Sequence, residues 1–150
     1  FAGRDIVFAS DNARLRVRQI DETYPDYARV IPSDRGEVSL TLPISDLTAA
    51  VRRVMALSSD KDIVLNLMAE PGLVSLAMAH PFLGTAAEDI AAPDVTGRLA
   101  LGFNPRYLLD ACRALGTDSV TLDMSDVMAP VCVTSDEDPG AVFVVMPMRA

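Results

Sequence analysis

The chain has 150 residues, the length of one ordinary domain, and 50% of them are hydrophobic. No apolar run approaches the roughly 18 residues that span a bilayer, and no signal-peptide pattern is present at the start. We therefore expect a soluble, cytoplasmic protein. The formal net charge of -8 argues against broad electrostatic binding to nucleic acid or anionic lipid, although a local basic face is compatible with it.

The first 20 residues predict two β-strands. The segment DIVFAS at 5–10 is rich in strand-forming residues. In NARLRVRQI at 12–20, Leu15 and Val17 alternate with arginines, which is the period of a half-buried strand. Because two strands alone are marginally stable in water, we expect the chain to be a fragment whose first part pairs with a sheet preceding it in a longer protein.

After a turn-rich connector at 24–37, one order of elements is predicted twice. The hydrophobic periods of 37–92 and of 97–146 each predict strand, helix, strand, strand, strand. The expected elements are 37–42, 44–59, 63–68, 72–78 and a weaker strand at 86–92, then 97–102, 103–116, 119–124, 129–134 and 142–146. An internal duplication of this kind predicts a pseudo-symmetric α+β domain with helices on one side of antiparallel sheets.

Both expected helices carry terminal signals. Ser45 is a candidate N-cap of the first helix. In the second, Asn104 is the candidate N-cap, Pro105 falls at the first helical position, and Gly116 supplies the stop.

The residues that carry chemistry are sparse. His80 is the only histidine, so no site can be built on a histidine pair or triad, and we expect His80 at a strand end or turn. Cys112 and Cys132 have apolar neighbours, which favours buried thiols and leaves a disulfide as the alternative. No cysteine–histidine cluster has metal-binding spacing, and no glycine-rich phosphate loop is present. We predict no cofactor and no metal.

Two carboxylate pairs are the remaining candidates for catalysis. Glu88 with Asp89, or Asp123 with Asp126, could act as an acid–base or Mg²⁺ pair. Scattered surface carboxylates are the favoured interpretation in an acidic chain. The residues by themselves therefore indicate a non-catalytic binding or assembly module.

Three motifs, in order and at roughly the same spacing, resemble the bacterial DNA polymerase III beta subunit family, the sliding clamps that act as processivity factors. They are YPDYARVIP at 24–32, GFNPRYLLDACRALG at 102–116 and VVMPMR at 144–149. Weaker similarity at 51–59 and 84–90 extends the resemblance over most of the chain.

The resemblance implies a DNA clamp fold in a ring-shaped homodimer with three similar domains per subunit. Each domain holds duplicated β-α-β-β-β units, with helices lining the hole and sheets outside. It implies that residues 1–33 are the end of the middle domain and its linker, and that residues 34–150 are the third domain. A clamp catalyses no reaction itself. It encircles duplex DNA without reading sequence, which implies a cytoplasmic, nucleoid-associated protein with no membrane contact.

The resemblance also implies a hydrophobic cleft, partly built by the middle domain. It receives short linear motifs from the replicative polymerase subunit, the clamp loader and repair polymerases. The positions that match its lining are Pro25, Arg29, Val30, Asn104, Tyr107, Met128, Pro130, Val144, Val145, Met146, Pro147, Met148 and Arg149. Methionine side chains adapt to varied apolar partners, which suits a site that accepts many peptides. Family members usually end in leucine, where this chain has Ala150.

The candidates for facing DNA are arginines on the two expected helices: Arg52, Arg53, Arg106 and Arg113. Arg106 and Arg113 are seven residues apart and therefore share a helix face.

Two other functions remain as alternatives. One is a clamp-like module that only oligomerises, through exposed sheet edges and the end of the first helix near Leu57. The other, less favoured, is a hydrolase that uses Asp123 and Asp126. Because ring closure in the family needs the first domain, we expect this chain alone to form no ring and to retain no circular DNA.

Overall fold

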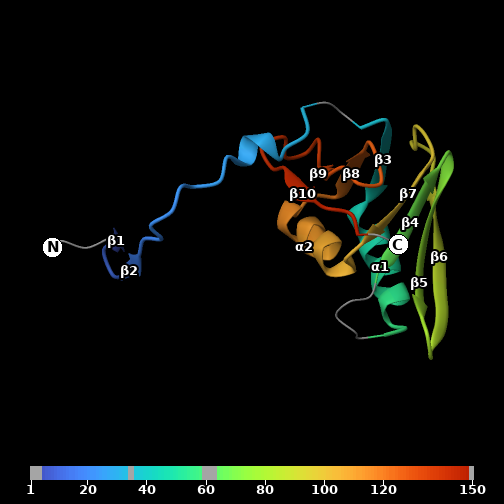
Figure 1. Cartoon of the computed structure of the whole chain (residues 1–150), viewed down its shortest axis with the longest axis horizontal. Coiled ribbons are helices and arrows are strands. Elements are labelled where there is room, and N and C mark those ends of the chain that lie inside the picture. Colours follow the sequence, from blue (N-terminus) through green and yellow to red (C-terminus); the bar gives the residue numbers. More distant parts are fainter. Residues whose placement is uncertain (1–4, 34–35, 59–63, 149–150) are drawn as a thin grey trace.

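The structure is a computed structural model, which describes residues 5–33, 36–58 and 64–148 (Figure 1). Its elements, in chain order, are β1 (Asp5–Ala9), β2 (Arg14–Arg18), the 3-10 helix η1 (Tyr27–Arg29), β3 (Val38–Pro43), α1 (Ile44–Met55), β4 (Leu65–Glu70), β5 (Gly72–His80), β6 (Gly84–Ala92), β7 (Leu99–Phe103), α2 (Pro105–Leu115), β8 (Ser119–Met124), β9 (Val131–Thr134) and β10 (Phe143–Val145). The predicted order of strands and helices is confirmed, and β6, the weakest prediction, is nine residues long.

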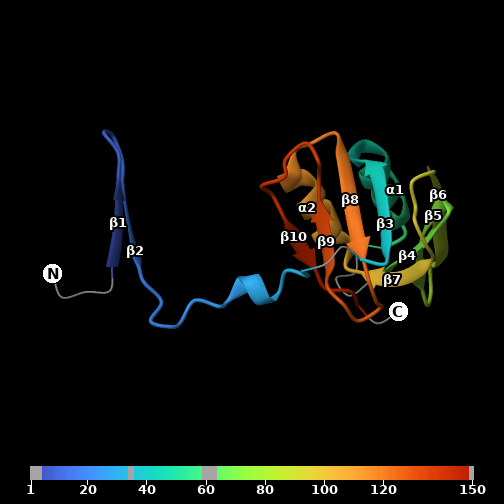
Figure 2. The same cartoon turned by 90° about the horizontal axis from the view of Figure 1, so that it is seen from above.

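β1 and β2 form an antiparallel hairpin that stands apart from the rest of the chain (Figures 1 and 2). Phe8 lies opposite Leu15 and Ile6 opposite Val17, so four apolar side chains share one face. They are between 42% and 59% exposed. Both predicted strands are therefore confirmed, and among the described residues nothing covers the apolar face of the hairpin.

The remaining strands form two four-stranded antiparallel sheets that exchange their first strands. The first sheet has the order β10-β9-β8-β3 and the second β6-β5-β4-β7. β3 opens the first repeat but pairs with β8 of the second, with Leu40 opposite Leu122. β7 opens the second repeat and pairs with β4 of the first, with Leu67 opposite Leu101. Neither repeat therefore completes a sheet without the other.

One hydrophobic core joins both sheets to the helices. In β3, Leu40 and Leu42 are buried while Thr41 between them is partly exposed, as expected for a sheet covered on one face. Leu47 of α1 and Leu108 of α2 are fully buried in the same core. The two helices contact each other, and both lie on the same side of β10, β9, β8 and β3 (Figure 2).

The cap predicted for α2 is confirmed and the cap predicted for α1 is wrong. Asn104 accepts a hydrogen bond from the Arg106 N–H at 3.0 Å, α2 begins at Pro105, and Gly116 ends it with a left-handed φ of 64°. In α1 the N-cap position is Pro43, because β3 runs directly into the helix. The Ile44 N–H donates instead to the Asp118 carbonyl at 2.8 Å, so the second repeat satisfies a group that a side-chain cap would otherwise bond.

Other expectations from the sequence have clear outcomes. His80 ends β5 at a turn, as predicted, where its Nδ1 accepts the N–H groups of Phe82 and Leu83. Cys112 and Cys132 are both free thiols, and burial raises the pKa of Cys112 to about 11. None of the helices in the described ranges is long and apolar enough to cross a membrane.

Candidate functional site

The C-terminal segment starts on one sheet and ends on the other. In β10, Val144 lies opposite Cys132 and Val145 opposite Val131. Continuing this antiparallel register by one residue brings Met146 opposite Pro130. Pro147 follows, which has no N–H and stops strand pairing.

Met148 then joins the second sheet. Its N–H donates to the Gly102 carbonyl of β7 at 2.7 Å, and the two residues form an isolated antiparallel bridge. Gly102 lies two residues before the cap of α2, and α2 also contacts β10. The segment 146–148 therefore crosses from the loop before β9 to the start of α2.

An exposed aromatic side chain, that of Tyr107, lies in the first turn of α2. Asn104 is partly buried, and its side chain is the N-cap of α2. Its backbone carbonyl accepts the Tyr107 N–H at 3.1 Å. The Tyr107 side chain is 61% exposed. The helix cap therefore orients the first turn and, with it, Tyr107.

The loop between β8 and β9 supplies a further apolar group. Asp126 accepts the Met128 N–H through Oδ1 at 3.0 Å and the Ala129 N–H through its carbonyl at 3.2 Å. This Asx-type turn holds out Met128, which is 57% exposed, and Val127, which is 51% exposed. Val127 is not among the cleft residues predicted from the sequence. An apolar residue beside a turn-forming aspartate was the available signal.

From the path of the chain end along β9 and β7, we group residues of three segments distant in sequence under the name terminal surface. It consists of Asn104, Tyr107, Val127, Met128, Pro130, Met146, Pro147 and Met148. Tyr107, Met128 and Met146 are each more than half exposed. Large apolar side chains left exposed together are typical of an interaction site, and we therefore treat these residues as the candidate site.

The remaining cleft candidates from the C-terminal segment are Val144, Val145 and Arg149. Val145 is 6% exposed and belongs to the core, whereas Val144 is partly exposed beside Cys132. Arg149 lies outside the described residues.

The three candidates from the connector are exposed and separate in sequence from the terminal surface. Pro25, Arg29 and Val30 lie in or beside η1, and all three are exposed. η1 lies between the hairpin and the body, on the β10 side in both views (Figures 1 and 2). The structure thus brings the connector toward the side that carries the terminal surface, without burying these three side chains.

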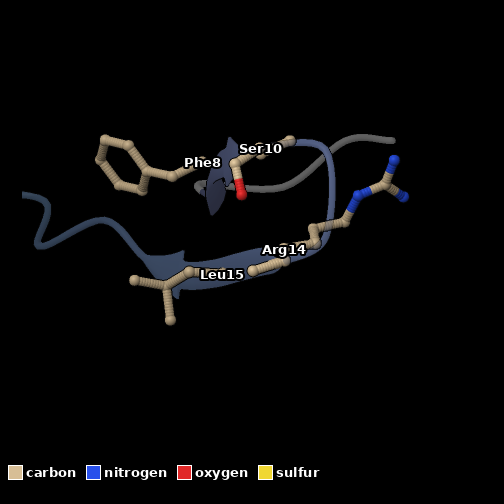
Figure 3. Close-up of a pocket in the computed structure, with 6 residues that line it drawn as sticks. Phe8, Ser10, Arg14 and Leu15 are labelled. Atoms are coloured by element: carbon tan, nitrogen blue, oxygen red, sulfur yellow. The ribbon is translucent and has the colours of Figure 1, made fainter.

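A concavity on the hairpin is a separate feature. Its lining includes Phe8, Ser10, Arg14 and Leu15. Phe8 and Leu15 extend to one side of the hairpin, and Arg14 extends toward the other (Figure 3). It holds no combination of groups suited to catalysis, and it is distant in the fold from the terminal surface (Figure 1).

All four candidate DNA-facing arginines are exposed on α1 and α2. Arg53 is engaged by Glu88 of β6, with its Nε 3.0 Å from Oε1 and 2.8 Å from Oε2. These hydrogen bonds raise the pKa of Arg53 and lower that of Glu88. In α2, a guanidinium nitrogen of Arg113 lies 3.4 Å from the Oδ1 atom of Asp110, which is one turn earlier in the same helix.

The structure separates one of the two candidate carboxylate pairs, Glu88 and Asp89. Glu88 and Asp89 are adjacent in β6 and therefore point to opposite faces. Glu88 bonds Arg53, whereas Asp89 accepts the Ser75 hydroxyl at 2.6 Å. Asp126 is used by the loop turn. Within the described ranges, no group of three or more carboxylate, histidine or cysteine side chains could hold a metal ion.

The chain is similar to known proteins along almost all of its length. Residues 28–149 match the family model described as DNA polymerase III beta subunit, C-terminal domain. A beta sliding clamp of Caulobacter vibrioides strain NA1000 is 35% identical over 137 residues, which cover 91% of this chain and 37% of the relative. The chain thus spans well under half the length of the curated relatives it matches.

Solved structures agree with the sequence comparison. A C. crescentus beta sliding clamp, with polyethylene glycol at a region proposed to tether the beta motif, superposes with a TM-score of 0.91 and 33% identity, over 98% of this chain and 39% of that one. A Bartonella birtlesii clamp bound to griselimycin gives a TM-score of 0.91 and 32% identity, over 98% of this chain and 40% of that one. The α+β fold with exchanged strands is therefore the fold of these clamps, and this chain belongs to the DNA polymerase III beta subunit family, the bacterial sliding clamps.

Proposed function

We propose that the chain is the C-terminal part of a DNA sliding clamp, with residues 34–150 as its third domain and residues 1–33 as the end of the middle domain and the linker. Membership of the family supports this proposal. So does the β1–β2 hairpin, whose apolar face is uncovered. The clamp is a non-catalytic processivity subunit that needs no cofactor and works in the cytoplasm at the nucleoid.

The terminal surface binds short linear motifs of the replicative polymerase, the clamp loader and repair polymerases. The observation that carries this proposal is the crossing of 146–148 between two sheets, which leaves Met146 54% exposed. Tyr107 at the start of α2 and Met128 in the β8–β9 loop are exposed as well. Methionine adapts to varied apolar partners. The related clamps that hold griselimycin or polyethylene glycol support a ligand site of this kind. Pro25, Arg29, Val30, Val144 and Arg149 complete the site in the whole protein.

Duplex DNA is held topologically by the homodimeric ring. With a net charge of -8, the outer surface repels DNA, while exposed arginines on α1 and α2 face the phosphates. Few phosphate contacts favour sliding over tight binding. Arg53 carries this contact less than Arg52, its neighbour on α1, because Arg53 already bonds Glu88.

Fluorescence anisotropy tests the peptide site. The probe is a labelled peptide with a glutamine followed by spaced leucine and phenylalanine, and the control peptide has alanine in place of both apolar residues. Replacing Met146 and Met148 together by alanine should weaken binding by about 2 kcal/mol, or about thirtyfold. Phe82→Ala, which removes a 92% exposed aromatic side chain at the β5–β6 turn, should leave the affinity unchanged. No saturable binding at about 1 mM peptide, even to the chain with its upstream domain restored, or equal binding of the control peptide, would refute the proposal.

A further inference from the structure

The bond between Met148 and Gly102 is made at the free edge of the second sheet. In the order β6-β5-β4-β7, β7 has a neighbour on one side only. The Met148 N–H reaches the Gly102 carbonyl at 2.7 Å on the other side. Pro147 has no N–H, so Met148 carries the next amide after Met146 that can donate to another strand.

Gly102 is the residue that lets the chain end approach this closely. A Cβ atom at Gly102 would lie 2.7 Å from the Met148 carbonyl oxygen and 2.8 Å from Cγ1 of Val64. Both distances are shorter than carbon atoms tolerate, and the Met148 oxygen belongs to the backbone. Gly102 does not have a positive φ, unlike Gly72, Gly84 and Gly116. Its backbone conformation therefore suits any residue, and the close contact is what requires glycine.

We propose that Gly102 is a positioning residue for the terminal surface. Because Gly102 has no side chain, segment 146–148 can cross the edge of β7 closely. The closeness of this crossing determines where the side chains of Met146 and Met148 lie. This inference rests on the proposed peptide-binding function of that surface. It adds a residue that contacts no peptide itself and acts through the Met148 backbone.

Segment 146–148 is held by few backbone hydrogen bonds, so a side chain at Gly102 would displace it. β10 has three residues, and its last pair is Val145 with Val131. Among the described residues beyond Val145, the segment is held by the backbone hydrogen bond from Met148 to Gly102. A methyl group at Gly102 would push the Met148 backbone away from β7, so the two methionines would lose their fixed positions.

The experiment compares Gly102→Ala with three other variants of this chain. Val64→Ala with Gly102→Ala removes the contact with Val64 Cγ1 and keeps the contact with the Met148 carbonyl oxygen, and Val64→Ala alone is its reference. Gly140→Ala is the matched control, because the nearest atom to a Cβ there is the Asp138 Oδ1 at 3.6 Å.

The first measurement is hydrogen exchange of individual amides by NMR. In Gly102→Ala and in the double variant, the Met148 N–H should exchange about tenfold faster or more, while the amides of Leu67 and Leu101 in the paired strands β4 and β7 stay protected. The Cε methyl signals of Met146 and Met148 should shift, and those of the buried Met78 and Met124 should not. Unchanged Met148 exchange in the double variant would overturn the proposal.

The second measurement is peptide affinity by anisotropy. The double variant should bind about tenfold more weakly than Val64→Ala, and Gly140→Ala should bind like wild type. If wild type binds no peptide even with its upstream domain restored, the proposed function fails, while the exchange experiment still decides the role of Gly102.

A third comparison leaves Gly102 intact, in case both alanine variants fail to fold. Met148→Pro removes the N–H and Met148→Ala keeps it, and neither retains the methionine side chain. Weaker peptide binding by the proline variant supports positioning through this bond, and equal binding by the two overturns it.

Discussion

Asn104 joins the stability of α2 to the geometry of the terminal surface. Its side chain accepts the Arg106 N–H at 3.0 Å and its carbonyl accepts the Tyr107 N–H at 3.1 Å. Asn104→Ala removes the first bond and leaves an N–H at the helix start without its acceptor. Loss of an N-cap of this kind costs about 1 kcal/mol. For a domain of this size, that free energy corresponds to a fall in Tm of about 4 °C.

The same variant should weaken peptide binding, because fraying of the first turn moves Tyr107, whose side chain is 61% exposed at the terminal surface. Calorimetry gives the Tm, and anisotropy gives the affinity. Asn104→Asp is the matched control, since a carboxylate also accepts the Arg106 N–H and is favoured at a helix N-terminus. Equal Tm values for Asn104→Ala and wild type would refute the argument that this cap stabilises α2.

Three further predictions concern the fold. Hydrogen bonds from the Asp118 and Ser119 N–H groups and the Ser119 hydroxyl lower the pKa of Glu137. Glu137→Gln should therefore lower the Tm at pH 7, and this difference should shrink as the pH falls below 4.5, the ordinary pKa of the group; a difference that grows in acid would contradict it. Fragments 1–93 and 94–150 should each be unfolded alone and should fold when mixed, as circular dichroism can check, because the repeats exchange β3 and β7. A folded single fragment would be incompatible with that exchange. Cys132 should react with a thiol reagent at pH 8 before Cys112, whose pKa burial raises to about 11, and mass spectrometry of the labelled peptides gives the order.

Local signals in the sequence determined the elements of this protein. The alternation of Leu40 and Leu42 with polar residues is a property of neighbouring positions, and so are the cap at Asn104 and the left-handed Gly116. The prediction failed at Ser45 because the first N–H of α1 is satisfied by Asp118, 74 positions along the chain from Ile44 (118 − 44 = 74). No local pattern encodes a partner at that distance.

The tertiary structure decided which elements meet. The period of two indicates which face of β3 is buried, but not that β3 pairs with β8 of the other repeat. The pairing of Arg53 with Glu88, which changes the ranking of the DNA-facing arginines, depends on the packing of α1 on β6. The terminal surface has the same origin. The chain end that carries Met146 pairs first with β9 and then, through Met148, with β7, and such pairings are set by long-range packing and hydrogen bonding rather than by the residues adjacent in sequence.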